Sequence, residues 1–245
     1  MLRGFSGEWG NRGIPCDQGS HNGSAIVFFH AIGHSIGPTW FARHPRSKAT
    51  YGAPSKSHVH IDPAWHEWIR RDLHDSRARW KIAAFHHPGF QSAATHWNDQ
   101  RTRLLAPVLE EGGVDIVFAG HVHNYQRSKP LRFQPADPAP TNPGGPVRGT
   151  FQLDEAFDGD RRTSAEGIVY IVTGGGGAGL YPMGPKDAPA TPVVDPDSAA
   201  PLIVKSMADR RSFSLIELDS KKLVLRQIDE NGGEVDRITL SKPAR

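Results

Sequence analysis

The sequence predicts an α/β fold in which parallel strands are joined through helices. Two short apolar segments, Lys81–Phe85 and Val114–Ala119, have the character of strands that are covered on both faces of a sheet. Between them, residues 99–111 carry apolar side chains at helical spacing and end at a glycine pair, which predicts a helix. A strand, a helix and a strand in this order predict two parallel strands with a crossover connection.

The N-terminal part of the chain gives weaker signals. Residues 1–57 have little periodicity and form a poorly patterned segment with one plausible strand at 25–29, ahead of a predicted domain at 58–245. Asp62 and Pro63 predict the start of a helix, with the aspartate as its N-cap and the proline in its first turn. Apolar residues at a spacing of four give this helix a buried face, and it is expected to end near residue 79.

The C-terminal part predicts further strands and turns. Residues 168–173 form another apolar strand, and the glycine-rich stretch after it matches G-x-G-x-x-G. A dinucleotide site needs a helix directly after such a loop, but prolines at 182 and 185 exclude one, so we expect a glycine turn packed close to the strand ends. Proline-rich loops are predicted at 134–146 and 185–200, and turns at 219–221 and Asn231-Gly232 predict C-terminal hairpins.

Length and composition fit one substantial domain rather than several. The chain has 245 residues, of which 37% are hydrophobic, and this is enough to bury a core. The net charge of +3 is mild and the basic residues are dispersed, so nucleic-acid binding is not expected. A single cysteine excludes an intrachain disulfide, and no apolar stretch reaches the roughly 18 residues of a membrane span. The N-terminus shows no signal peptide, and the sequence leaves the compartment and the oligomeric state open.

Both predicted strands run directly into histidine. Phe85 is followed by His86 and His87, and the second strand ends at Gly120, followed by His121 and, two residues later, His123. In extended backbone, residues 121 and 123 would point the same way, and parallel strands deliver their carboxyl ends to one edge of the sheet, where ligands of open α/β sheets bind. Neutral imidazole is a common metal ligand, so this edge predicts a metal site. The alternative is that these histidines are core residues hydrogen-bonded to carbonyl groups.

These motifs resemble those of a known family. A-F-H-H-P-G-F paired with V-D-I-V-F-A-G-H-V-H-N-Y-Q-R is similar to the calcineurin-like metallophosphoesterases, and within them to purple acid phosphatases, whose later motifs are V-x-x-H and G-H-x-H. The resemblance extends over about residues 60 to 240. It implies a sandwich of two mixed β-sheets flanked by helices. It also implies hydrolysis of phosphate monoesters or diesters by metal-activated hydroxide, in the manner of an acid phosphatase or phosphodiesterase.

The resemblance also implies roles for individual residues. His86 and His121 match ligands of one metal, and His123 matches a ligand of the other. His96 falls where the family has a histidine that contacts the substrate phosphate and assists the leaving group, so it is the candidate catalytic residue. Two divalent or trivalent ions, Fe, Zn or Mn, are expected from the family, whose members are often secreted or periplasmic. The implied partner is a phosphate ester, without nucleic acid or membrane.

The chain departs from the family pattern in its N-terminal motifs. The aspartate motifs G-D-x-x-Y and G-D-x-x-D do not occur before Leu131, and D-x-G and D-x-H occur there only as Asp17-Gln18-Gly19 and Asp72-Leu73-His74. The stretch Gly19-Ser20-His21-Asn22 only partly matches G-N-H-D/E. A polar loop is the preferred interpretation of that stretch. Two-metal hydrolysis needs ions about 3.5 to 4 Å apart, held by a bridging carboxylate. We therefore expect a chain that lacks the first βαβ unit, with one ion as an alternative to two. The alternative function is a non-catalytic or mononuclear metal-binding remnant of a metallophosphoesterase.

The remaining candidate residues are given structural roles. His87 is expected to point away from the ligand His86, because adjacent side chains on a strand alternate, and to make supporting hydrogen bonds or to face the groove. Tyr125 and Arg127 are expected to brace the turn, and Asp154 and Asp158 to act in loops or caps. The second H-x-H sequence, His58-Val59-His60, is expected to be solvated surface.

Overall fold

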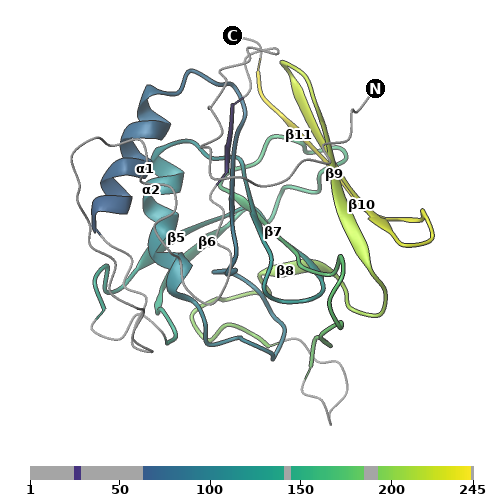
Figure 1. Ribbon diagram of the computed structural model, residues 1–245. Coiled ribbons are helices and arrows are strands. Elements are labelled where there is room, and N and C mark those ends of the chain that lie inside the picture. The colour runs from purple at the N-terminus through teal and green to yellow at the C-terminus, as the bar shows by residue number, and fades with distance from the viewer. Residues whose placement is uncertain (1–24, 29–62, 141–144, 185–192, 244–245) are drawn as a thin grey trace, which may run out of the picture.

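The centre of the protein is a six-stranded mixed sheet (Figure 1). The computed structural model describes residues 25–28, 63–140, 145–184 and 193–243. In spatial order the strands of this sheet are β1 (Ala25–Phe28), β2 (Lys81–Phe85), β3 (Ile116–Ala119), β7 (Val169–Thr173), β4 (Tyr125–Ser128) and β8 (Ile203–Met207). The first four run parallel, whereas β4 is antiparallel to both β7 and β8. The predicted parallel pairing of the two strands that precede the histidines is confirmed, and so is the strand predicted at 25–29.

A second sheet is formed by the C-terminal strands β9 (Ser212–Leu218), β10 (Lys222–Asp229) and β11 (Glu234–Ser241), which form an antiparallel meander. Its two tight turns lie where the sequence predicted them. The Asp219 carboxylate accepts the backbone N–H groups of Lys221 and Lys222 in the first turn. In the second, Gly232 has φ of +82°, a conformation that glycine adopts readily. A separate hairpin pairs β5 (Leu131–Pro135) with β6 (Gly149–Leu153), so the proline-rich stretch begins inside a strand.

The helices are shorter than the sequence predicted. α1 (Pro63–Asp75) ends four residues before the expected position at 79. The predicted helix at 99–111 is divided into a 3₁₀ helix, η2 (Arg101–Leu105), and α2 (Ala106–Glu111). Pro107 explains this division, because proline fits the first turn of an α-helix but has no N–H to continue a preceding one. No helix in the described part of the chain is long and apolar enough to cross a membrane.

The central sheet is covered by different layers on its two faces, as Figure 1 shows. On one face, Ile69 and Leu73 of α1 and residues of α2 pack against Ala83 and Val117 of the sheet. On the other face, side chains of β10 and β11 pack against Ile82 and Ile116. The alternation of neighbouring strand residues between these two cores is the pattern of a sheet covered on both sides. The predicted sandwich is confirmed, with one mixed and one antiparallel sheet.

Candidate metal centre

The histidines lie at the carboxyl edge of the central sheet. The registers of β2 and β3 place Phe85 opposite Ala119, so the chain leaves both strands at the same level. The backbone N–H of Gly120 then donates to the carbonyl of His86 at 3.0 Å, which holds the two exits together. Gly174, which follows β7, packs against this turn, because a Cβ atom there would lie 2.3 Å from the Val122 carbonyl oxygen. The expected glycine turn close to the strand ends is therefore present.

Three imidazole rings meet at this edge. One nitrogen from each of His86, His87 and His121 lies within 4.8 Å of the other two, and within the described residues this is the one such cluster of metal-binding side chains. The closest pair is His121 Nδ1 and His86 Nε2, which are 3.1 Å apart. Two nitrogens on a tetrahedral zinc ion, each about 2.05 Å from it, are separated by about 3.3 Å. The observed spacing therefore fits two ligands of one small cation.

The structure does not bring His123 into this three-histidine group. Its Nδ1 lies 2.8 Å from the Gly179 carbonyl, and its ring stacks on Tyr181 with centroids 4.1 Å apart. Residues 121 and 123 would point the same way only in extended backbone, but His121 has φ of +61°, in the left-handed region. This turn breaks the alternation, so strand geometry does not apply to residues 121 and 123. Because a carbonyl only accepts, Nδ1 of His123 carries the hydrogen and its Nε2 keeps the lone pair.

His87 was expected to point away from His86, and the structure shows otherwise. β2 ends at Phe85, so the two histidines lie in a bend rather than on a strand, and strand alternation does not apply to them. Their ring centroids are 4.9 Å apart, and the ring of His87 lies 4.2 Å from that of His121. His87 is also almost completely buried, with 5% of its surface exposed.

Asp99 is the residue that the sequence analysis missed. Its Oδ2 lies 3.4 Å from Nε2 of His87 and 3.9 Å from Nε2 of His121, and it accepts a hydrogen bond from Arg101 at 3.0 Å. Asp99 stands twelve residues after His87, in the turn that precedes η2, and no motif marks it. Only the tertiary structure brings this carboxylate to the histidines.

His96, the candidate catalytic residue, lies at the solvent side of the group. Its ring centroid is 4.2 Å from that of His121 and 5.7 Å from that of Tyr181, and the residue is exposed. Like His121, it has a positive φ, of 60°, which is uncommon outside glycine and is seen at functional turns. A group bound at the three histidines would be within reach of this exposed ring.

The electrostatics of the group favour neutral imidazoles. Burial lowers the pKa of His87 to about 4; the charge of Asp99 opposes this effect, while Arg101 and the neighbouring histidines add to it. Burial also lowers the pKa of His121 to about 3, and the nearby imidazoles His87, His96 and His86 lower it further. Neutral imidazole is the form that binds metal, so both rings are ready to act as ligands at neutral pH.

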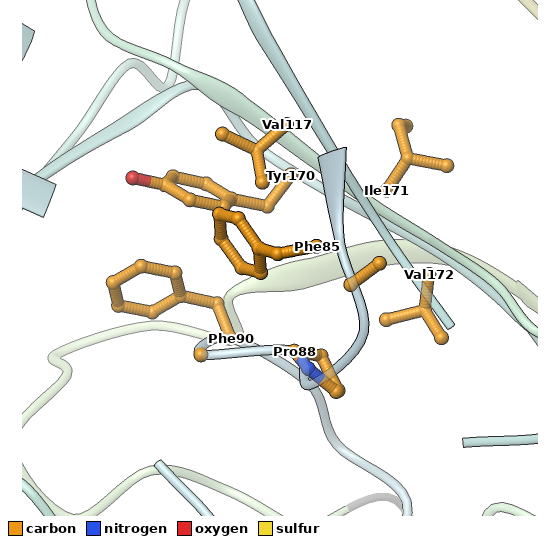
Figure 2. A pocket seen from close by; sticks show the side chains of 9 residues that line it. Phe85, Pro88, Phe90, Val117, Tyr170, Ile171 and Val172 are labelled. Carbon is orange, nitrogen blue, oxygen red and sulfur yellow. The ribbon is translucent and has the colours of Figure 1, made fainter. Parts of the chain in front are cut away.

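An apolar pocket lies next to the histidines, but it cannot hold a ligand for them. Phe85, Phe90, Val117 and Tyr170 line it together with Pro88, Ile171 and Val172, as Figure 2 shows. Its interior has no space for a water molecule, so it is a packing gap rather than a ligand site.

The other candidate residues have structural roles. Asp154 and Asp158 accept backbone N–H groups in their own loops, as expected. Tyr125 and Arg127 both hydrogen-bond to Asp236 of β11, so they join the two sheets rather than brace the histidine turn. The histidine pair at 58–60 and the Gly19–Asn22 stretch lie outside the described residues.

Comparison with known proteins adds family information to this geometry. Residues 7–125 match the calcineurin-like phosphoesterase family. This range includes the two strands that run into the histidines, and the histidines themselves. Purple acid phosphatase 18 of Arabidopsis thaliana is 38% identical over 91 residues, covering 35% of this chain and 20% of that protein. Purple acid phosphatase 22 of the same plant is 26% identical over 157 residues, covering 55% and 34%. The matched part of the chain thus spans between a fifth and a third of these relatives.

Among solved structures, a purple acid phosphatase from yellow lupin (Lupinus luteus) seeds aligns with 75% of this chain and 29% of its own, at 19% identity and a TM-score of 0.49. The family match covers both histidine motifs as far as Tyr125. The predicted resemblance to the calcineurin-like phosphoesterases, and within them to the purple acid phosphatases, is confirmed.

Proposed function

We propose that this chain binds a transition-metal ion at His86, His87 and His121 and uses it to hydrolyse phosphate esters. The observation that carries the proposal is the convergence of three ring nitrogens within 4.8 Å of one another at the carboxyl edge of the sheet. Three such nitrogens form an open site, in which further positions are left for water and substrate. The family match and the purple acid phosphatase relatives support the same reaction class.

The residues present fit a metal ion in both geometry and chemistry. Nitrogens of His121 and His86 face each other at 3.1 Å, and within the described residues the buried Nδ1 of His87 has no hydrogen-bond partner. A buried polar atom without a partner is costly, and a metal ion would offset that cost. When bound, such an ion supplies hydroxide near neutral pH and polarises the phosphoryl oxygens.

His96 would contact the substrate. Its exposed ring lies beside that of His121, where it can donate a hydrogen bond to a phosphate oxygen and a proton to the leaving oxygen. The substrate class is a phosphate monoester or diester.

One described site accounts for one ion. The three-histidine group includes no carboxylate, and His123, the expected ligand of a second ion, lies apart on Gly179. A relative is named as an Fe(3+)-Zn(2+) purple acid phosphatase, and two ions are also proposed for this chain, with His123 in the second site. Among the described residues no carboxylate belongs to this group, and this favours a second candidate function, a mononuclear metal-binding protein without turnover.

Metal content and hydrolysis measured together test the proposal. The protein would be analysed for Fe, Zn and Mn per chain and assayed with an aryl phosphate, beside His121→Ala and the matched control His74→Ala, a surface histidine paired with Asp75. We expect bound metal and turnover that His121→Ala abolishes and His74→Ala leaves unchanged. Bound metal without turnover would select the second candidate. No bound metal in the unaltered protein would refute both.

A further inference from the structure

The Asp99 carboxylate has a position that neither the family motifs nor a local structural role explains. It contacts His87 and His121 through the same nitrogen of each ring, Nε2, at 3.4 and 3.9 Å. In the described residues no backbone N–H donates to it, and η2 begins after Gln100 without a side-chain cap. Asp99 therefore does not serve as the cap of the helix that follows it. Its carboxylate faces the histidine group instead.

The two contacts decide which ring nitrogen carries the hydrogen. A carboxylate only accepts, so it favours the tautomer in which Nε2 of the facing imidazole is protonated. In His121 this leaves the Nδ1 lone pair directed at His86, where the two nitrogens are 3.1 Å apart. In His87 it leaves Nδ1, which is buried and has no hydrogen-bond partner within the described residues. The lone pair of His87 thus has no partner within the described residues, and that of His121 faces only the ring nitrogen of the neighbouring candidate ligand His86.

Arg101 holds the carboxylate in this position. Its guanidinium donates to Asp99 Oδ2 at 3.0 Å, and its side chain is 12% exposed. Asp99 Oδ1 is buried without a hydrogen-bond partner in the described part of the chain, so this oxygen has unused capacity to accept. The contacts to the histidines are longer than ordinary hydrogen bonds and leave room for the rings to turn toward the carboxylate.

We propose that Asp99 is a positioning residue that fixes the tautomers of His87 and His121, and that His87 is thereby the third metal ligand, through Nδ1. The arrangement is the carboxylate, histidine and metal relay in which an outer carboxylate raises the basicity of a ligand and sets its orientation. It serves two ligands with one carboxylate. The proposal rests on the metal site of the proposed function, but it concerns residues that the family motifs leave unassigned.

Zinc affinity provides a test that does not depend on turnover. Metal-stripped protein would be titrated with Zn²⁺ against a chromophoric chelator, for the unaltered chain, Asp99→Asn, His87→Gln and His121→Ala. Loss of an outer carboxylate partner weakens metal binding by about 10 to 100-fold. We expect that loss for Asp99→Asn, partial recovery in Asp99→Glu, and a larger loss for His87→Gln. The matched controls are His74→Gln and Asp75→Asn, an exposed histidine and carboxylate pair 3.2 Å apart.

Cobalt substitution separates positioning from a merely structural role. The visible absorption of bound Co²⁺ reports the ligand set, and we expect Asp99→Asn and His87→Gln to change it, whereas the thermal melting of the metal-stripped proteins stays close to that of the unaltered chain. Should Asp99→Asn fail to fold, His87→Gln carries the test of the third ligand and Arg101→Gln the test of the carboxylate's position.

Unchanged Zn²⁺ affinity and Co²⁺ spectrum in Asp99→Asn and His87→Gln, together with weakened binding in His121→Ala, would overturn this proposal and leave the proposed function standing. Absence of Zn²⁺ binding by the unaltered protein would overturn both.

Discussion

Replacing Arg103 by methionine should strongly destabilise the fold. The guanidinium is buried with a side-chain exposure of 2%, and it pairs with Asp195, whose side chain is 4% exposed. It also donates to the carbonyl of Gly89 at 2.7 Å and to that of Val147 at 3.2 Å. Three phenylalanine rings surround it, with centroids 5.1 to 5.5 Å from its central carbon. Burial lowers the pKa of Arg103, and Asp195 opposes that effect by favouring the charged form.

The magnitude follows from what methionine leaves behind. Methionine fills much of the same volume, so the packing loss is small, but Asp195 becomes a buried charge without its partner. Removing one member of a buried ion pair costs about 3–5 kcal/mol. The two carbonyls retain some capacity to bond with water or neighbours, so we take the lower half of that range. Replacing both partners, in Arg103→Met with Asp195→Leu, removes the stranded charge and should recover most of the loss.

Urea denaturation followed by circular dichroism measures both effects. The variants Arg103→Met, Asp195→Leu and the double change would be compared with Arg71→Met, whose arginine pairs with Glu67 at the surface and should change the free energy of unfolding by less than about 1 kcal/mol. A cost below about 1 kcal/mol for Arg103→Met, or no recovery in the double variant, would refute the reasoning.

Four further changes test other parts of the structure. Tyr125→Phe removes the 2.7 Å hydrogen bond to Asp236, which keeps Arg127 as a partner, so urea denaturation should show a loss of about 1 kcal/mol, and no loss would contradict the role in joining the sheets. Gly174→Ala places a methyl group against the Val122 carbonyl. It should lower the free energy of unfolding by about 1–3 kcal/mol and weaken Zn²⁺ binding in the chelator titration. An unchanged melting curve would show that the turn can shift. His123→Ala should leave the first zinc equivalent in place in an elemental count, because the three-histidine group does not include it, and loss of all zinc would contradict this. The metal-free protein should lose stability as the pH falls from 6.5 toward about 4. The pKa values of His87 and His121 are lowered in the folded state, so over this window the unfolded chain binds more protons than the folded chain. The urea midpoint of His121→Ala should depend less on pH over the same window.

Local sequence signals predicted the strands that carry the site. Apolar runs predicted the strands from Lys81 and Val114, and the helix signal between them predicted parallel pairing, which places their ends at one edge. The glycine stretch after β7 was also placed correctly, because prolines exclude a helix there. These features depend on residues that are close together in the chain and on general rules of sheet topology, so they can be predicted from the sequence.

The orientation of side chains at the strand ends could not be predicted in the same way. Alternation holds only while the backbone is extended, and both pairs of histidines lie immediately after a strand has ended. His121 adopts a left-handed conformation that is uncommon for histidine, so the extended backbone assumed for residues 121 to 123 is absent there. His87 follows the end of β2, so it joined the group instead of opposing it. Asp99 reaches the histidines only through tertiary packing, which no local spacing indicates.

The edge of the sheet also bears on whether the chain holds one ion or two. β1 runs parallel to β2, so its carboxyl end at Phe28 points to the same edge as the three histidines. The family match begins at residue 7 and therefore includes the segments on both sides of this strand. His123 keeps its Nε2 lone pair beside this edge, because Nδ1 is used by Gly179. One zinc equivalent needs no donor beyond the three-histidine group. Two equivalents would instead require donors beyond that group, with His123 among them and at least one oxygen ligand, so the count decides between the one-ion and the two-ion proposal.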